Sequence, residues 1–231
     1  MPPFSTSRSI LFAMLVASSS TLFAQSLKDI SSQDANAGLK AALEKGSGAA
    51  VTKLAIENGF LNNEKVKIQL PGVLQQAQPL LKMTGQSQQL DDLVLSMNRA
   101  AESAVPLAKP LLINAIKSMS ITDAKNILSG GDTSVTNFFK EKTAESLSIK
   151  FLPVVKKVTD RTRVSSQYNS AMEHVSKFGV VPEKEATVEA YVTQRTLDGL
   201  YFMIAEEEKA IRQDPLATGS AIIGKVFGVL K

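Results

Sequence analysis

The fold of this chain is decided by residues 87–119, SQQLDDLVLSMNRAAESAVPLAKPLLINAIKSM. Apolar residues recur there at alternating spacings of four and three, which keeps one face of a long helix apolar. Half of these positions are alanines, so a neighbouring helix can approach closely. Pro106 and Pro110 lie inside the stretch, and each removes a backbone donor, so we expect a kink near Ala104. The apolar positions are Leu90, Val94, Met97, Ala101, Ala104, Ala108, Leu111 and Ala115.

Helical periodicity also dominates the rest of the chain. Two helices are expected from Ser32 to Lys45 and from Ala49 to Glu57, separated by a break at Gly46–Gly48. The residues Ser120-Ile-Thr-Asp123 predict a capping box at a further helix start. Only Val66–Leu70 alternates like an extended segment. The sequence therefore predicts an all-α, single helical-bundle-like domain with a long Pro-kinked central helix.

The first 24 residues resemble a targeting segment. Arg8 precedes the apolar run Ile10–Ala17, and small residues lead to Ala24. This order is typical of a secretory signal peptide, and the run is too short to span a bilayer. We expect cleavage near Ala24, with Ala17 as the alternative site, and a periplasmic or secreted protein. A buried N-terminal helix is the competing interpretation.

Cleavage at that position divides the chain into a signal peptide, residues 1–24, and one all-helical domain, residues 25–231. Residues 25–85 are a possible small N-terminal lobe. Because Arg8 is the only charge removed, the formal net charge falls from +4 to +3.

Composition excludes several classes of site. The chain has no cysteine, so disulfides and thiolate chemistry are excluded, and the absence of free thiols fits export. The single histidine, His174, excludes metal sites that need two imidazoles from one chain. The most basic stretch, Lys150–Arg163, lacks the charge excess and interleaved aromatics of a nucleic-acid site. We therefore expect no metal, no cofactor and no nucleic acid.

A series of short motifs resembles domain-of-unknown-function family 4197. The match covers nearly the whole chain after residue 24. The resemblance implies a single helical domain exported by Gram-negative bacteria and, without a cysteine, a soluble periplasmic form. It implies no activity and no catalytic residues. The motifs, in order, are Gly38–Leu43, Ile68–Pro71, Asn98–Glu102, Met119–Ala124, Ile127–Gly131, Thr136–Phe139, Tyr191–Thr193, Leu197–Leu200, Ala205–Lys209, Ile211–Pro215 and Lys225–Gly228.

Polar residues beside the central stripe form the first candidate site. At 100° per residue, Asn98 and Glu102 flank the apolar face, and Arg99 can reach Glu102 one turn away. One interpretation is a polar cluster at the mouth of a pocket. The other is a structural network that satisfies the end of a neighbouring helix.

Glu207 is the second candidate. It falls on an apolar stripe with Leu200, Ile204 and Ile211, so we expect it to be buried and to pair with an arginine such as Arg99. Its neighbours Glu206 and Glu208 are expected to form exposed pairs with Lys209 and Arg212.

We expect a non-enzymatic binding protein for an apolar ligand or an envelope component such as a lipid or protein. One alternative is a hydrolase that uses Glu102, Glu207 or the lone His174. The other is a structural interaction module of the cell envelope. The apolar tail Ala221–Leu230 either packs on the bundle or makes peripheral contact with a membrane.

Overall fold

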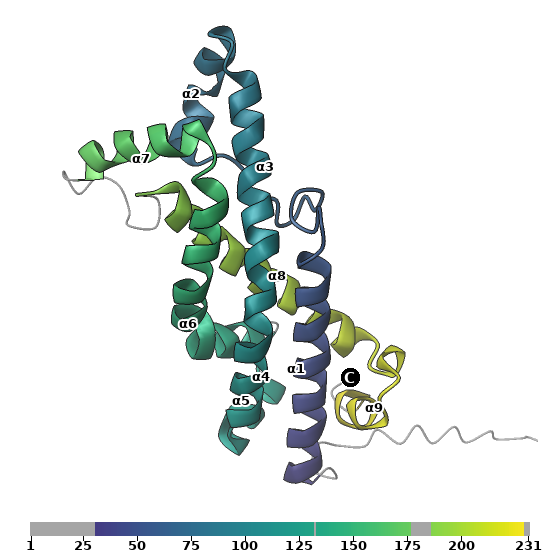
Figure 1. Cartoon of the computed structure of the whole chain (residues 1–231). Coiled ribbons are helices and arrows are strands. Elements are labelled where there is room, and N and C mark those ends of the chain that lie inside the picture. The colour runs from purple at the N-terminus through teal and green to yellow at the C-terminus, as the bar shows by residue number, and fades with distance from the viewer. Residues whose placement is uncertain (1–30, 132, 177–185, 229–231) are drawn as a thin grey trace, which may run out of the picture.

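The computed structural model describes residues 31–131, 133–176 and 186–228, without the side chains of residues 171 and 173–176. Every regular element in this part of the chain is helical, so the predicted all-α fold class is confirmed. The expected signal peptide lies outside the described residues. The elements in Figure 1 are α1 (Ser32–Leu54), α2 (Gly72–Met83), α3 (Ser87–Ala104), the 3₁₀ turn η2 (Val105–Leu107), α4 (Ala108–Ser118), α5 (Ile121–Ser129), α6 (Ser134–Thr159), α7 (Arg163–Ser176), α8 (Val188–Gln213), the 3₁₀ turn η4 (Leu216–Thr218) and α9 (Ala221–Phe227).

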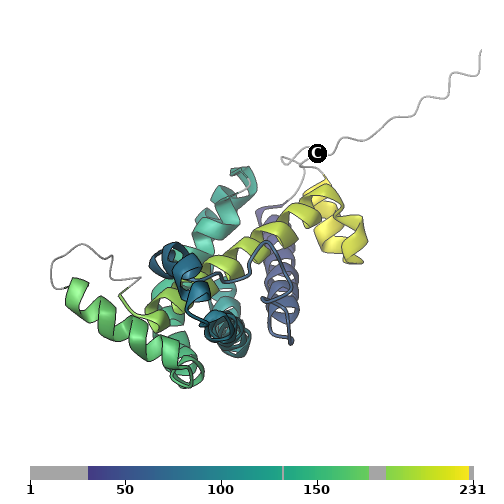
Figure 2. The same ribbon diagram turned by 90° about the horizontal axis from the view of Figure 1, so that it is seen from above.

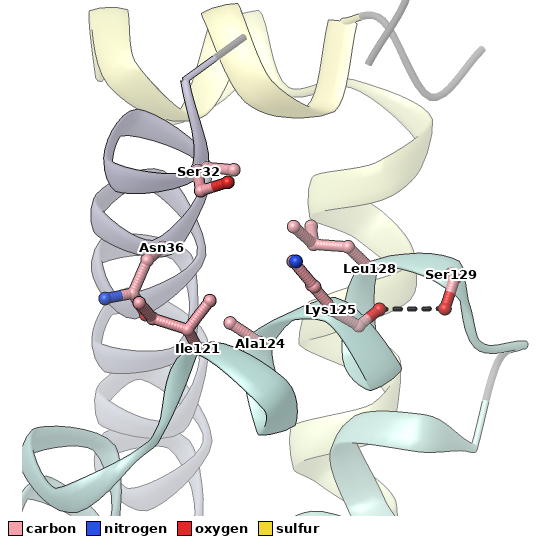
Figure 3. Close-up of a pocket in the computed structure, with 8 residues that line it drawn as sticks. Ser32, Asn36, Ile121, Ala124, Lys125, Leu128 and Ser129 are labelled. Carbon is pink, nitrogen blue, oxygen red and sulfur yellow. Dashed lines mark hydrogen bonds between the residues drawn. The ribbon is translucent and has the colours of Figure 1, made fainter. Parts of the chain in front are cut away.

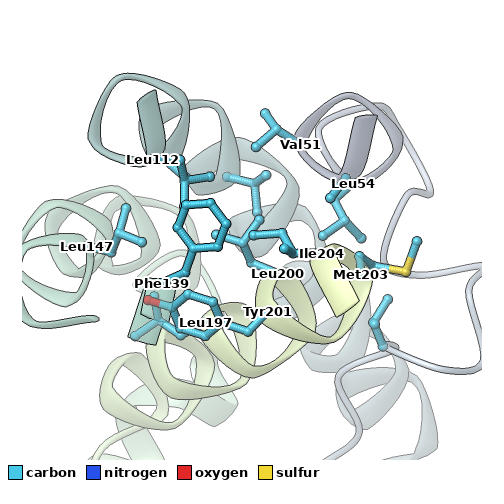
Figure 4. Close-up of a cluster of buried hydrophobic side chains, with 14 of the residues drawn as sticks. Val51, Leu54, Leu112, Phe139, Leu147, Leu197, Leu200, Tyr201, Met203 and Ile204 are labelled. Carbon is cyan, nitrogen blue, oxygen red and sulfur yellow. The ribbon is translucent and has the colours of Figure 1, made fainter. Parts of the chain in front are cut away.

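Helix α8 crosses the molecule and contacts α1, α3 and α6. Helices α7 and α9 lie near its two ends, at opposite sides of the molecule (Figure 2). The core around α8 is aliphatic and aromatic: Figure 4 shows Phe139 of α6, Leu112 of α4 and Leu200 of α8 close together, and each is fully or almost fully buried. Each such side chain contributes roughly 1.5–3 kcal/mol through removal from water. The bundle is therefore held by side-chain packing around one crossing helix.

The predicted central helix is divided. Helix α3 ends at Ala104, η2 contains Pro106, and α4 continues the chain. The 3₁₀ turn lies where Pro106 removes a backbone donor, while the kink near Ala104 stays a prediction. Most positions of the predicted stripe are buried, and Ala101, Ala104 and Ala108 are completely so. Small side chains on this face allow the close contacts of α3 with α6 and of α4 with α1.

The predicted break at Gly46–Gly48 is wrong, because α1 continues through it to Leu54. Gly46 is buried, and a Cβ atom there would lie 3.5 Å from the Cβ of Glu207 and from Cδ1 of Ile211. These are ordinary van der Waals distances, so Gly46 is a buried residue inside a continuous helix and forms no turn. A glycine inside a helix is tolerated at a cost of about 1 kcal/mol when packing compensates for it.

The apolar tail packs on α1. Ile223, Val226 and Phe227 of α9 are at most 1% exposed. These side chains are part of the core and are not available to a membrane surface, whereas Leu230 lies outside the described residues. Among the described helices, none is long and apolar enough to cross a bilayer. Helix α1 contacts α4, α5, α8 and α9, so the N-terminal helix packs against later parts of the chain. The organisation of residues 25–231 as one domain stays a prediction.

Substitutions at two glycines of α1 test the packing of α9 against α1. A Cβ atom at Gly38 would collide with the side chain of Val226 and lie 3.0 Å from the carbonyl oxygen of Ile222, whereas a Cβ at Gly48 meets nothing within 4 Å. Gly38→Ala is expected to lower the free energy of unfolding by about 1–3 kcal/mol through overpacking. Gly48→Ala is expected to raise it by roughly 0.5–1 kcal/mol through helix propensity. Urea denaturation followed by circular dichroism measures both. Equal stability of the Gly38→Ala variant and the natural protein would contradict this packing.

Candidate functional site

The candidate residues of α3 face a non-helical segment, residues 55–71, which links α1 to α2 and is called the connector here. Phe60, Val66, Ile68 and Leu70 of the connector are buried. The alternating pattern of residues 66–70 thus places every second side chain in the core, although no strand forms in the described residues. A buried non-helical backbone needs hydrogen-bond partners from outside itself.

Asn98 supplies two of these partners. Its side chain is completely buried. Its Oδ1 accepts from the N–H of Ile68 at 2.9 Å, and its Nδ2 donates to the carbonyl oxygen of Ile68 at 2.9 Å and to that of Val94 at 2.8 Å. One amide side chain thereby pairs with both backbone groups of Ile68, as a neighbouring strand does.

Glu102 holds the other end of the connector. Its Oε1 accepts from the backbone N–H groups of Phe60 at 3.0 Å and Leu61 at 3.2 Å. Its Oε2 accepts from Arg99 Nη1 at 2.5 Å. The carboxylate is only 5% exposed, and two amides together with a guanidinium offset the cost of its burial.

Arg99 also closes the first turn of the connector. Its Nη2 donates to Asn58 Oδ1 at 2.9 Å and lies 3.1 Å from Glu57 Oε1. Asn58 has a φ of +68°, a left-handed conformation that asparagine tolerates better than most residues. The structure therefore brings Asn98, Arg99 and Glu102 together, and their contacts favour the structural network over a pocket mouth.

Glu207 does not join this cluster. It forms an ion pair with Lys53 of α1 at 2.5 Å, and its side chain is 16% exposed. The predicted Arg99–Glu207 pair is wrong, because Arg99 is occupied by the connector and Glu102, whereas Glu207 faces α1.

Among the three consecutive acids Glu206–Glu208 of α8, the buried one is Glu208. Glu208 pairs with Arg212 Nε at 2.5 Å as expected, but it is 6% exposed rather than a surface residue. Arg212 Nη2 also donates to the carbonyl oxygen of Ile127 at 3.1 Å, near the end of α5. Glu206 contacts Lys65 rather than Lys209, and the Lys65 ammonium holds the pKa of this carboxyl below its usual value.

The geometry provides little for the hydrolase alternative. The carboxylate of Glu102 is hydrogen-bonded to the connector and to Arg99, and that of Glu207 is paired with Lys53, so each already has its partners within the fold. The side chain of His174 lies outside the described residues. Within the described part of the chain, no group of three or more His, Cys, Asp or Glu residues could hold a metal ion.

Two surface hollows are relevant to ligand binding. The first lies between α1 and α5, where Figure 3 shows Ile121, Ala124 and Leu128 opposite Ser32. It is mainly apolar, with a volume of about 230 Å³, below the range of roughly 300–1,000 Å³ typical of ligand pockets. Ser129 Oγ on its rim donates to the carbonyl oxygen of Lys125 at 2.8 Å and is thereby satisfied within α5.

The second hollow, called the connector–α8 groove here, has a volume of about 450 Å³. Sequence reasoning missed its charged residues. The alternation of Val66, Ile68 and Leu70 was a usable signal, because it places Lys65 and Lys67 on the side away from the core. Nothing in the sequence indicated that α8 would supply the facing wall. The groove is lined by Lys65, Val66, Lys67, Ile68, Gln69, Gln75, Tyr191, Arg195, Asp198, Gly199 and Phe202.

A sequence model of the family described as "Protein of unknown function (DUF4197)" matches residues 29–228. No curated protein and no solved structure matches the chain. The matched range includes the connector, its partners on α3 and the whole of α8.

The role of Asn98 is tested by removing its amide. Asn98→Ala leaves both backbone groups of Ile68 buried without their partners, so we expect a loss of about 2–4 kcal/mol in the free energy of unfolding. Asn62→Ala, at an exposed position of the same connector, is the control and is expected to change stability by less than about 0.5 kcal/mol. Urea denaturation gives both values, and amide hydrogen exchange is expected to show loss of protection at Ile68. An Asn98→Ala variant as stable as the control would contradict the structural network.

Proposed function

The chain belongs to the DUF4197 family of proteins of unknown function, and for it we propose the role of a non-enzymatic interaction module that docks onto another protein through α2 and the first turns of α3. We call these residues, 72–92, the arm. In Figure 1 the arm forms one tip of the molecule. The observation that carries the proposal is the exposed apolar face of α2.

Helix α2 contains no buried residue. Val73, Leu80 and Met83 are 51%, 65% and 85% exposed. With Ala77 between them, they follow helical spacings of four, three and three and share one side of α2. Leu74 and Leu81 lie about a quarter-turn away and pack against the core. The outer stripe of α2 is thus apolar without a covering element in the described part of the chain, as in helices that bind a partner.

An apolar small-molecule carrier has less support. The hollow between α1, α6, α8 and α9 has a volume of about 10 Å³, barely enough for one water molecule. Large side chains that line it, Phe227, Ile204 and Leu43, are themselves buried and fill the interior. A hollow of this size cannot enclose a lipid tail.

The composition of the arm favours a protein over a membrane as its partner. Lys82 is its only cation, and Asp91 and Asp92 give it a net charge of −1. Its apolar residues are aliphatic, and it has no aromatic side chain. Helices that bind at membrane interfaces usually carry cations on the polar face and often aromatic anchors. An apolar helix of a partner protein fits a neutral stripe of two to three turns better.

The absence of native cysteine allows a site-specific test. A Leu80→Cys variant carrying a benzophenone label is photolysed in a lysate of cells that make the protein. The control is Ile149→Cys on α6, since Ile149 is aliphatic and 67% exposed, close to the 65% of Leu80. We expect a cross-linked partner from position 80 and not from position 149.

A competition experiment tests whether the cross-link from position 80 depends on the apolar stripe of α2. Unlabelled natural protein is expected to suppress the cross-link. The unlabelled double variant Val73→Asp/Leu80→Asp is expected to need at least about a tenfold higher concentration for the same suppression. The double variant should retain its melting temperature, because neither residue is buried. Equal competition by both proteins, the same product from position 149, or no product would overturn the proposal. A cross-linked dimer of the chain would replace the partner protein with a second copy.

We also propose that the protein acts in the periplasm after signal-peptide cleavage, on the strength of the pattern in residues 1–24. Native mass spectrometry of protein from a periplasmic extract is expected to give a chain beginning at Gln25. The same spectrum reports oligomeric state and any retained ligand. Full-length protein confined to the cytoplasmic fraction would exclude export.

A further inference from the structure

The walls of the connector–α8 groove are fixed against each other. The hydroxyl of Tyr191 donates to the carbonyl oxygen of Gln69 at 3.0 Å and so joins α8 to the connector. Gly199 allows direct contact at the floor, since a Cβ atom there would lie 2.8 Å from Cε1 of Phe60 and 3.3 Å from Cβ of Val66. A groove with such walls exists before any ligand arrives, which lowers the entropic cost of binding.

Cations outnumber acids in this groove. Its lining includes Lys65, Lys67 and Arg195 but only one carboxylate, Asp198. Among the described residues, Lys67 has no ion-pair partner. The Arg195–Asp198 pair is long, at 3.5 Å, and both side chains are nearly half exposed. Exposed pairs of this kind contribute little, so Arg195 can turn to a bound anion at small cost.

Lys65 is the exception among the three cations. It forms an ion pair with Glu206, and its charge holds the pKa of that carboxyl below the usual value. The Lys65 charge is thereby largely matched. Lys67 and Arg195 are left as the two groups able to receive a negative charge.

Aromatic and apolar surface lies beside these cations. The Arg195 guanidinium lies 5.2 Å from the centre of the Tyr191 ring, and Lys65 Nζ lies 5.8 Å from that of Phe202. Phe202 is 39% exposed, and the groove also borders the buried Val66 and Ile68. A ring with part of its face in solvent is available for stacking with a flat ligand.

We propose that the connector–α8 groove binds a small organic anion in which a carboxylate is joined to a flat aromatic body. The carboxylate contacts Lys67 and Arg195, and the body lies against Phe202. A bare phosphate leaves the apolar surface unused, and a neutral aromatic compound leaves both cations unused. The groove volume of about 450 Å³ lies within the range of small-molecule sites.

Three probes separate these contributions in titrations followed by ¹H–¹⁵N NMR. They are 2-naphthoate, which has charge and body, 2-naphthamide, which has the body alone, and inorganic phosphate. We expect 2-naphthoate to shift the amides of Lys67, Gln69 and Arg195 and to bind at least about tenfold more tightly than either other probe. Equal affinity of phosphate or the amide, or shifts confined to other regions, would overturn the proposal.

Variants assign the contacts. Lys67→Met and Arg195→Gln are each expected to weaken 2-naphthoate binding about fivefold, the size of one partly exposed ion pair, and Phe202→Ala by a similar factor. Lys150→Ala, which removes an exposed cation of α6, is the charge-matched control and should have no effect. Unchanged affinity in both Lys67→Met and Arg195→Gln would contradict the site. Gln75 is the one arm residue that lines the groove, so the arm control is the single variant Leu80→Asp, five residues away; it should bind 2-naphthoate normally, and the two proposals can then fail separately.

Discussion

The bidentate pairing of Asn98 with Ile68 is the interaction on which the connector, and the arm that follows it, depend. The chain leaves α1 and must reach α2 through the connector, and the connector buries apolar side chains without forming a helix. Turn hydrogen bonds within the connector satisfy part of its backbone, and each buried backbone group left unpaired costs about 1–3 kcal/mol. Asn98 and Glu102 satisfy the connector at two points from a single face of α3. The two residues are spaced by one helical turn, which matches a segment lying along the helix.

The connector is in turn enclosed from the other side by α8. Tyr191 and Gly199 bring α8 against it, so it lies between two helices that are about 90 residues apart in the chain. Both proposed binding surfaces extend from this arrangement. The arm begins where the connector ends at Pro71, and the groove uses Lys65 and Lys67 of the connector as one wall. The α3 network of Asn98, Arg99 and Glu102 contacts only the fold itself. By holding the connector, it fixes the positions of the arm and of the connector–α8 groove.

The periodicity of apolar residues was sufficient to predict which segments are helical, but it did not predict which helices pack against each other. The stripe of residues 87–119 predicted a long apolar face that is buried, and the capping box at Ser120 and Asp123 is confirmed with both of its hydrogen bonds. The break at Gly46 was wrong because a single sequence does not distinguish a glycine that ends a helix from one inside a helix that tertiary packing stabilises.

The candidate acids of α8 show the same difficulty at the level of single residues. Helix α8 contacts α1, α3 and α6, so its buried arc is too wide for one stripe to define, and of residues 206–208 it is Glu208 rather than Glu207 that is buried. The groove was beyond prediction for a related reason. Its cations come from residues 65–67 and 195, and only tertiary packing brings them to one place.

The buried ion pairs give a physical criterion for separating structural cations from binding cations in this protein. Arg99 pairs with Glu102 and also bonds the connector, and Arg212 pairs with Glu208 and also bonds the last turn of α5. In each case a mostly buried arginine meets a buried carboxylate and a loop or helix end, so its charge and donors are used within the fold. Lys67 and Arg195 differ, since the first has no ion pair among the described residues and the second has only a long, exposed one. Charge that the fold leaves unmatched beside a fixed apolar wall is available to a ligand, and the groove has such charge whereas the α3 cluster does not.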